Sequence, residues 1–509
     1  MRSNTPPPSY LRPGRRVFVR TICTHLARPT VRDPLWSYQY PMTGRVVNSL
    51  THRGPHRSQL RKNVVAGSFT ALWNIILSLI SYPVYLHFFG YEFYGLWLLL
   101  STVVGFAQLG GLGFGQALAK LVSEAIGDDV PGEIREYFST AVVTVSSSAA
   151  VVIIILLLCR APIVATMRLP PHLVPVLRHL FPVAALLSVY AFVVDTQNQM
   201  LAGLGRLDLC TFDQALGQTM GTAISIVAVA LGAGIEAMLF GSAVTLICVH
   251  GLSLWQVRRI WAATPTASGK LFSLNGLSRR AFKRLLLQGG GMLAGTLLAV
   301  LLVPFNRLML SRFGNLRAVA VLDIAFSSTQ RLRSVVDLGI RALMPEVSRL
   351  SACGILRRGV DLSALVKKAT RFTALVVLPT AVLLELLAEP ILRLWLRGGF
   401  TPTVVPAFRI CLLGATMSAL GLPGYYVLFG LGRISQIIGA YALQSAVNVT
   451  ALCCLVLVGL RLDSTLLSFT MAGGVVFANV FLLRQGRQAI CALRARAVRD
   501  DVCSVSAAL

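Results

Sequence analysis

The stretch LAGLGR at residues 201–206 returns as LFGLGR at residues 428–433, a spacing of 227 residues. Each copy closes a long apolar run that is the fourth in its half of the chain. Landmarks that recur in order at one spacing indicate a membrane unit duplicated in parallel, which is how many secondary transporters are built. Two further pairs have offsets of 224 and 226 residues: Phe89-Gly90 with Phe313-Gly314, and Leu112-Gly113 with Leu338-Gly339.

The composition is that of a membrane protein. Of the 509 residues, 55% are hydrophobic and only 13% are charged, whereas a soluble domain carries about 25% charged residues. The mean hydropathy of +0.70 agrees with this class. The net charge of +27 would suggest a nucleic-acid partner in a soluble protein. Here the basic residues lie mostly in tails and loops, where the enrichment of Lys and Arg in cytoplasmic loops accounts for them, so we expect no nucleic-acid partner.

Twelve apolar runs follow residue 63, each of roughly the 20 residues that cross a bilayer. The segments after even-numbered runs carry most of the basic residues, such as Arg258, Arg259 and Arg284 in the central one. Since cytoplasmic loops are enriched in Lys and Arg, we predict a multi-pass protein with both termini in the cytoplasm. The predicted spans are 66–88, 94–112, 138–159, 173–200, 215–233, 236–256, 285–310, 317–338, 372–388, 404–428, 434–459 and 464–484.

The predicted fold is therefore an all-α polytopic membrane protein, with about twelve transmembrane helices in two six-helix lobes related by a parallel repeat. The segment before the first span holds twelve Arg and Lys residues against one acid, Asp33, and its prolines oppose a helix. We predict five parts: a basic disordered cytoplasmic tail at 1–63, an N-terminal lobe at 64–260, a cytoplasmic linker at 261–283, a C-terminal lobe at 284–484 and a cytoplasmic tail at 485–509.

Motifs of soluble enzymes are absent from the sequence. The phosphate-binding pattern G-x-x-x-x-G-K-[ST], the zinc pattern H-E-x-x-H and the nucleophile pattern G-x-S-x-G do not occur. The ten cysteines are scattered and form no C-x-x-C pair. We therefore predict that the chain is not an enzyme and uses no cofactor or metal.

Charged and amide residues inside the apolar runs are the candidate functional residues, because charge at membrane depth is costly. Asp195 lies in the fourth run, where it either pairs with a cation inside the bundle or titrates. Asn306 and Arg307 lie in the seventh run. Asp323 lies in the eighth run, and Arg331 follows it toward the cytoplasmic end.

Structural alternatives stay open for these residues. The Arg331 side chain can snorkel to the interface, and Arg307 can lie among the external headgroups. Asn74, in the first run, fits a hydrogen bond between helices as well as a contact with a ligand.

Three phrases of the sequence resemble one family. FFGYEFYGLW at 88–97 and LGGLG at 109–113 look like the first hairpin of bacterial polysaccharide flippases, and PILRLWL at 390–396 is similar to another recurrent phrase of these proteins. The family is the polysaccharide branch of the multidrug/oligosaccharidyl-lipid/polysaccharide exporter (MOP) superfamily. The resemblance covers about residues 64–484 and implies a MATE-like bundle of six plus six helices around a central cationic cavity.

The resemblance further implies that the chain flips an undecaprenyl-diphosphate-linked oligosaccharide across the bacterial inner membrane, by alternating access, for surface polysaccharide or exopolysaccharide synthesis. Arg and Lys suit a lipid diphosphate in a site of low dielectric constant. The implied partners are this lipid-linked substrate, membrane lipids, and polymerase or export machinery. The candidate substrate-binding residues are Arg307, Arg331, Asn306 and Asn74, and the candidate coupling or gating residues are Asp195 and Asp323.

Two other function classes remain open at this point: a drug or small-molecule exporter on the same fold, and a membrane enzyme of glycan assembly. A major-facilitator transporter also has twelve spans in two parallel halves. That family usually carries a D-R-x-G-R-like loop after its second span, and residues 113–127 hold no such loop.

Overall fold

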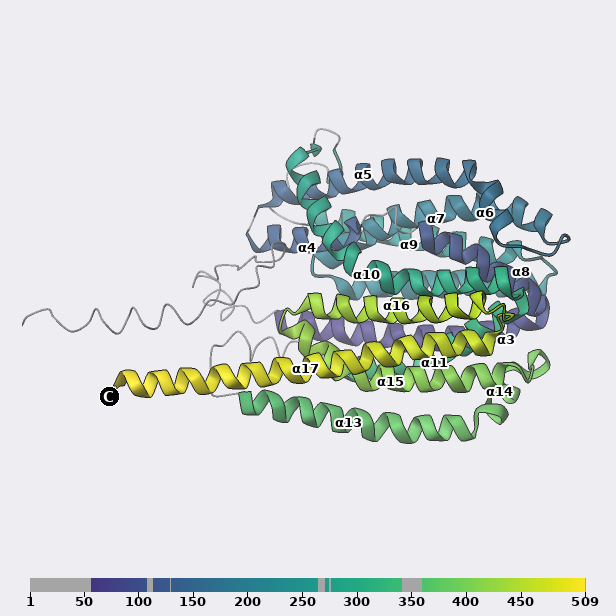
Figure 1. The fold of residues 1–509 in the computed structure, drawn as a ribbon. Helices are drawn as coiled ribbons and strands as arrows, with labels where there is room; N and C mark the ends of the chain where they lie inside the picture. The colour runs from purple at the N-terminus through teal and green to yellow at the C-terminus, as the bar shows by residue number, and fades with distance from the viewer. Residues whose placement is uncertain are drawn as a thin grey trace, which may run out of the picture. The chain divides into compact units, whose positions relative to one another are not determined.

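The computed structural model describes residues 56–107, 113–128, 130–263, 271–273, 276–340 and 359–508. These residues form helices and no strand (Figure 1). The N-terminal half consists of α3 (His56–Ala107), α4 (Phe114–Gly127), α5 (Pro131–Leu158), α6 (Arg160–Thr166), α7 (Val174–Gly203), α8 (Leu207–Ala230) and α9 (Glu236–Ala262). The C-terminal half consists of α10 (Arg279–Phe313), α11 (Leu316–Ile340), α13 (Gly359–Leu386), α14 (Ala388–Leu396), η4 (Arg397–Gly399), α15 (Val404–Gly430), α16 (Ile434–Leu457) and α17 (Ser464–Ala508).

The predicted fold class is confirmed, because the described chain is helical and many of its helices are apolar. Within these residues, 8 helices are long and apolar enough to cross a membrane: α3, α5, α7, α9, α13, α15, α16 and α17. The other predicted spans fall on the second leg of α3 and on α8, α10 and α11. The count of twelve spans and the exact boundaries of the two lobes stay predictions.

Predicted segment ends differ from the helix ends in two places. Helix α3 already begins at His56, so the last residues of the predicted tail at 1–63 are helical, while residues 1–55 lie outside the described part. Helix α17 continues to Ala508 and includes most of the predicted C-terminal tail. Part of the predicted linker at 261–283 also lies outside the described residues.

Gly90 divides α3 into two legs. Its φ of 64° and ψ of −178° are not helical, and a positive φ is cheap only for glycine. The two legs contain the first predicted span and most of the second. The phrase that surrounds Gly90 therefore forms the predicted hairpin.

The repeated LxGLGR phrase forms the same turn in both halves. Gly205 has a φ of +77° and Gly432 a φ of +70°. In each turn the arginine N–H donates back to the carbonyl five residues earlier, at 2.9 Å, from Arg206 to Leu201 and from Arg433 to Leu428. This left-handed glycine with a backward bond is the Schellman end of a helix. These glycines therefore end α7 and α15 in tight turns.

The N-terminal copy of this turn is tied to α3. Arg206 Nε donates to Asp208 Oδ1 at 3.1 Å, and Gln59 Nε2 donates to the same oxygen at 2.9 Å. Asn63 Nδ2 donates to the carbonyl of Gly205 at 3.2 Å. Partial burial opposes ionisation of Asp208, but the hydrogen bonds and charge of Arg206 outweigh it and lower the pKa of this carboxyl. A polar network therefore fixes the start of α8 against the first helix.

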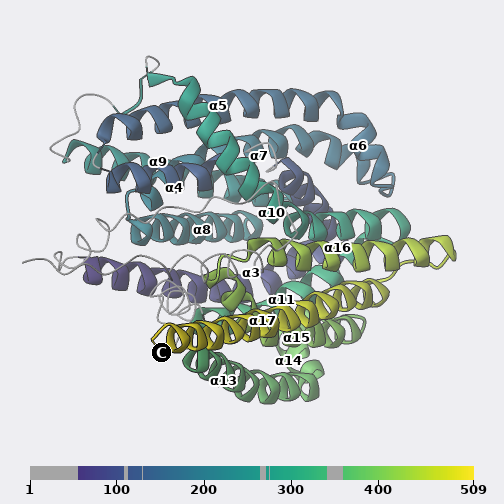
Figure 2. The ribbon, with the colours of Figure 1, turned by 60° about the vertical axis from the view of Figure 1, so that its left-hand side comes forward.

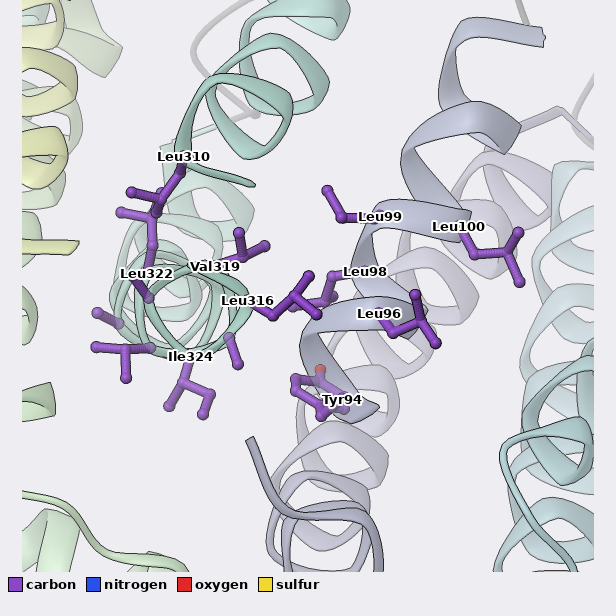
Figure 3. Packing of buried hydrophobic residues seen from close by; sticks show 14 of the residues in the cluster. Tyr94, Leu96, Leu98, Leu99, Leu100, Leu310, Leu316, Val319, Leu322 and Ile324 are labelled. Carbon is purple, nitrogen blue, oxygen red and sulfur yellow. The ribbon is translucent and has the colours of Figure 1, made fainter. Parts of the chain in front are cut away.

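Buried side chains distinguish the two ends of the bundle. We call the end with Gly90 and Gly314 the outer end, and the end with Gly205 and Gly432 the inner end, following the predicted topology. At the outer end one hydrophobic core joins both halves, from α3, α7 and α9 to α10, α11, α14, α15 and α17. Figure 3 shows Leu98 and Leu99 of α3 beside Leu316 and Val319 of α11.

At the inner end the described residues form separate cores. One core contains α4, α5 and α7 with Trp261 of α9. Two smaller cores lie among α11, α15, α16 and α17. The two halves thus share one core at the outer end, whereas among the described residues the inner end holds separate cores, of which that of the N-terminal half also includes the first turns of α10.

Helix α10 connects the two halves along its length. Its first turns, with Ala281 and Leu285, belong to the inner core of the N-terminal half, and Leu310 near its end belongs to the shared outer core. Figure 2 shows α10 running from α5 toward α16. A Cβ atom on Gly113 would lie 2.6 Å from the carbonyl oxygen of Gly289. Glycine at 113 is therefore required for this crossing.

Replacing Gly205 with alanine is expected to destabilise the fold by about 1–2 kcal/mol, because an L-residue with a Cβ pays this cost in the left-handed region. Asparagine at the same position should cost less, since it tolerates that conformation. The measurement is the thermal unfolding midpoint of the purified protein in detergent. Gly67→Ala is the matched control, because Gly67 lies in α3 with open space around the added methyl. An equal midpoint for Gly205→Ala and Gly67→Ala would contradict the role of the turn.

Candidate functional site

A buried ion pair joins the last turns of α10 to the first turns of α11. The two helices are connected by a short link at Gly314 and Asn315, so their facing residues lie at similar distances from that link. Arg307 Nη2 donates to Asp323 Oδ1. The Arg307 side chain is 17% exposed and the Asp323 side chain 3%. At 1.5 Å per residue both groups lie about 9–11 Å from the outer ends of their helices.

Helix α3 of the N-terminal half completes the hydrogen bonds of this pair. Tyr82 OH donates to the second carboxylate oxygen of Asp323, Oδ2, at 3.1 Å. Arg307 Nη1 donates to Ser101 Oγ at 3.2 Å. The ring of Tyr94 meets Tyr82 edge to face at 5.9 Å between centroids. Both oxygens of Asp323 are therefore bonded, one from each half of the chain.

A second contact across the halves follows from Pro83. Proline has no N–H, so the carbonyl four residues earlier in a helix loses its donor. That carbonyl belongs to Leu79, and Trp395 Nε1 donates to it at 2.8 Å. Trp395 lies in α14, in the phrase PILRLWL, and its ring lies 6.0 Å from that of Tyr82. The carbonyl left free by Pro83 thus provides a site for the indole of the other half.

We call Tyr82, Ser101, Arg307, Asp323 and Trp395 the outer latch. The backbones approach closely beside it: a Cβ atom on Gly95 of α3 would lie 2.2 Å from the carbonyl oxygen of Leu316. Tyr91 OH also donates to the carbonyl of Gly399 at 2.7 Å. Bonds between the two halves therefore occur along the whole outer end.

Sequence reasoning identified two members of the latch and missed three. Arg307 and Asp323 were expected in the membrane, and the structure brings them together. Tyr82 and Ser101 carry no charge and lie in an ordinary apolar helix. Trp395 could have been linked to α3 only by asking which donor reaches the carbonyl freed by Pro83.

The other predicted substrate residues are not members of the latch. Asn306 is fully buried, and its Nδ2 donates to the carbonyl of Leu302 in its own helix at 2.8 Å. Asn74 is half-buried on α3. Arg331 is half-buried on α11, about two turns beyond Asp323 toward the inner end. Among the described residues Arg331 forms no ion pair, so its charge is not neutralised by a carboxylate.

Asp195 lies on α7 beside α4. A Cβ atom on Gly115 would lie 2.8 Å from Asp195 Oδ2, so the carboxylate rests against the glycine. Gln199 Nε2 donates to Asp195 Oδ1 at 3.4 Å, and the side chain keeps an exposed surface. Within the described part of the chain no cationic side chain pairs with it. The carboxylate is therefore accessible to a cation or a proton.

A cavity of about 650 Å³ lies outside the latch. It is lined by Tyr91 and Glu92 of α3, by Arg168, and by Arg317 at the start of α11. Arg317 stacks over the ring of Tyr91 at 5.6 Å. The cavity lies where the two halves meet, on the far side of the latch from the inner cores.

The latch pair should be strongly coupled. Arg307→Ala leaves a buried carboxylate without its cation, which costs about 3–5 kcal/mol. The double variant Arg307→Ala, Asp323→Ala removes both charges and should recover much of that loss. Unfolding of the four proteins in detergent, with the double-mutant cycle computed from them, measures the coupling. Additive losses would contradict a direct pair.

The chain is similar to known proteins both in its sequence pattern and in its fold. The family model described as "Polysaccharide biosynthesis protein" matches residues 60–351. No curated protein matches the chain. A multidrug resistance MATE family transporter of the MOP superfamily in an inward-facing conformation aligns with a TM-score of 0.65 and 16% identity, over 84% of this chain and 96% of that one.

Two further solved structures have the same fold. The lipid II flippase MurJ in an inward closed conformation aligns with a TM-score of 0.64 and 14% identity, over 85% of this chain and 91% of that one. An outward-facing MATE family transporter gives 0.58 and 16%, over 87% and 98%. These identities establish similarity of fold alone. The family match covers more than half of the chain, and with it the resemblance seen in the sequence is confirmed: the chain belongs to the polysaccharide biosynthesis protein family.

Proposed function

We propose that this flippase-family protein moves a lipid-linked oligosaccharide, with undecaprenyl diphosphate as the lipid carrier, across the bacterial inner membrane by alternating access. The observation that carries the proposal is the contrast between the ends of the bundle. One core and the outer latch join the halves at the outer end, while at the inner end the described residues form separate cores and α10 is the C-terminal helix that enters the core of the N-terminal half. This is the arrangement of a carrier that admits its substrate from the inner side.

The negatively charged diphosphate of the lipid carrier requires a positively charged side chain at its binding site. Arg331 fits that requirement, because it lies at membrane depth and has no carboxylate partner among the described residues. Arginine holds a phosphate oxygen pair through two parallel N–H bonds. We therefore assign headgroup contact first to Arg331, with Asn74 as a neutral contact on α3.

Arg307 has a different place in this proposal. Its charge is already neutralised by Asp323, so it becomes available to the headgroup only when the latch opens. Asp323 then serves as a gating carboxylate, and Asn306, bonded to its own helix, supports the position of Arg307. Asp195, accessible and without an ion pair among the described residues, remains the candidate for coupling to an ion.

The cellular setting completes the proposal. Both termini lie in the cytoplasm, as the basic segments indicate. The substrate arrives from the enzymes that build the lipid-linked unit, and the product passes to a polymerase or to export machinery. A cell that lacks the protein should lose surface polysaccharide and accumulate lipid-linked repeat units on the cytoplasmic side. Unchanged polysaccharide, in a strain without a redundant homologue, would contradict the proposal.

The second candidate function is export of a drug or another small molecule. The likeness of fold to a multidrug resistance MATE transporter favours it. The same deletion strain separates the two functions. Increased sensitivity to cationic dyes with normal polysaccharide would support the exporter.

Arg331→Ala is expected to reduce polysaccharide export at least tenfold, because a hydrogen bond to a charged group such as the diphosphate is worth about 1.5–3 kcal/mol. Arg331→Lys should recover part of the export, since it keeps the charge and loses the paired geometry. The measurement is surface polysaccharide per unit of protein in the membrane fraction. Arg259→Ala is the matched control, because Arg259 stacks on Trp255 at the end of α9, far along the chain from the latch. Normal export by Arg331→Ala would remove Arg331 from the site.

A further inference from the structure

The N-terminal half encloses a second group of polar side chains that the proposed substrate path does not use. Asn198 lies on α7, Asp213 on α8 and Gln256 on α9. Their exposed fractions are 1%, 0% and 7%. Burying an amide or a carboxylate costs free energy unless each polar atom finds a partner. Such a group inside a helix bundle therefore needs an explanation.

The three side chains are in contact or one turn apart. Gln256 Nε2 donates to Asp213 Oδ1 at 2.7 Å. Asn198 Nδ2 donates to the carbonyl oxygen of Cys210 at 3.4 Å. Cys210 precedes Asp213 by three residues on α8, and residues three apart lie on one face of a helix. The amides of α7 and α9 thus approach the same face of α8.

The unsatisfied atoms of this cluster are all acceptors. Asp213 Oδ2, Asn198 Oδ1 and Gln256 Oε1 are buried and have no hydrogen-bond partner among the described residues. Across the same part of the chain no Lys or Arg side chain pairs with Asp213. Each such orphan costs about 1–3 kcal/mol. Three buried oxygen atoms without a hydrogen-bond donor are suitable ligands for a bound cation.

The internal repeat argues against a purely structural role. At the 227-residue offset, Asp213 corresponds to Ala440 on α16, and Asn198 corresponds to Tyr425 on α15. Ala440 is 1% exposed and belongs to a hydrophobic core. The C-terminal half therefore packs the corresponding helix face without a carboxylate. The polar group is a feature of one half alone.

The two helices that hold the carboxylate and Gln256 are packed tightly. A Cβ atom on Gly221 of α8 would lie 2.4 Å from the carbonyl oxygen of Gly241 on α9, and one on Gly217 would lie 2.6 Å from Val249 Cγ2. Glycines at these places allow close helix approach. The site is therefore held by rigid elements.

We propose that Asp213, Asn198 and Gln256 bind one alkali-metal cation, with Na⁺ as the expected ion. One carboxylate balances one positive charge, so the donor set suits a monovalent ion better than a divalent one. Carboxylate and amide oxygens are the ligands that hard cations prefer. A proton on Asp213 would satisfy Oδ2 and only one of the two amide oxygens, whereas a cation satisfies all three.

Asp195 gives this site an entrance. It precedes Asn198 by three residues on α7 and therefore lies on the same side of the helix, but its side chain keeps an exposed surface. An exposed carboxylate one turn from a buried oxygen cluster attracts a cation toward it. The cation site itself is argued from the buried oxygen atoms. Only the role of the ion rests on the proposed transport function, in which an ion gradient would drive the cycle.

The test measures binding directly, without substrate. The purified full-length protein in detergent is unfolded thermally while NaCl replaces choline chloride at constant ionic strength. Binding to the folded state alone raises the midpoint with Na⁺ concentration until it saturates. Asp213→Asn should abolish this rise, and Asn198→Ala should shift its half-maximal Na⁺ concentration at least fivefold. Asp128→Asn, an exposed carboxylate at the end of α4, should leave the rise unchanged.

Three results would overturn the proposal: a midpoint in the wild type that does not respond to Na⁺, a response that choline produces equally, or a response that survives in Asp213→Asn. A midpoint that depends on pH and not on Na⁺ would replace the cation with a proton. If Asp213→Asn fails to fold, Asn198→Ala and Gln256→Ala decide the question by their weakened Na⁺ response. If the wild-type protein binds no Na⁺ and the deletion strain loses its polysaccharide, the cation site is contradicted and the transport function stands. If the protein binds Na⁺ and the deletion strain keeps its polysaccharide, the transport function is contradicted and the cation site stands.

Discussion

The outer end of the bundle depends on the charge of Arg307 being neutralised away from water. A guanidinium and a carboxylate can stay in an apolar bundle only if they pair and their remaining bonds are satisfied. Asp323 supplies the pair, and Tyr82 and Ser101 of the other half supply the bonds. The electrostatic requirement of two C-terminal helices is thus met by an N-terminal helix. Because the hydrophobic core around them is shared as well, closure of the outer end is a property of both halves together.

The two halves have similar helices and different polar groups. Helices α8 and α16 have the same length, begin after the same glycine–arginine turn, and are related by one offset. The ion pair occurs in the C-terminal half, and the buried carboxylate–amide group occurs in the N-terminal half. Duplication supplies the frame, which needs only apolar residues and glycines. The charged and amide side chains differ between the two copies, so residues at equivalent positions do not have equivalent roles.

Most of the fold could be predicted from the sequence, because membrane-length apolar runs and glycine turns are local signals. The LxGLGR phrases marked the ends of two apolar runs, and the phrase around Gly90 predicted the hairpin. The helix ends were harder: the polar start of α3 at His56 and the long α17 carry no hydropathy signal. The candidate site was predictable only where charge revealed it, as at Arg307 and Asp323. The pairing of these two, and the partners Tyr82, Ser101 and Trp395, depend on contacts between distant segments that spacing does not encode. Asp213 was overlooked because it lies near the start of a helix, where a carboxylate is common.

The bond from Trp395 to Leu79 has a consequence for the energy of opening. Pro83 leaves the Leu79 carbonyl without its helical donor, and the indole replaces that donor only while the halves are together. Once α14 moves away, the carbonyl must find water or stay unpaired in an apolar surrounding. The two halves then separate only when water enters between them at the outer end. Exclusion of water from this end therefore opposes opening. A single proline in α3 thus makes hydration of the outer end part of the energy barrier to separating the two halves.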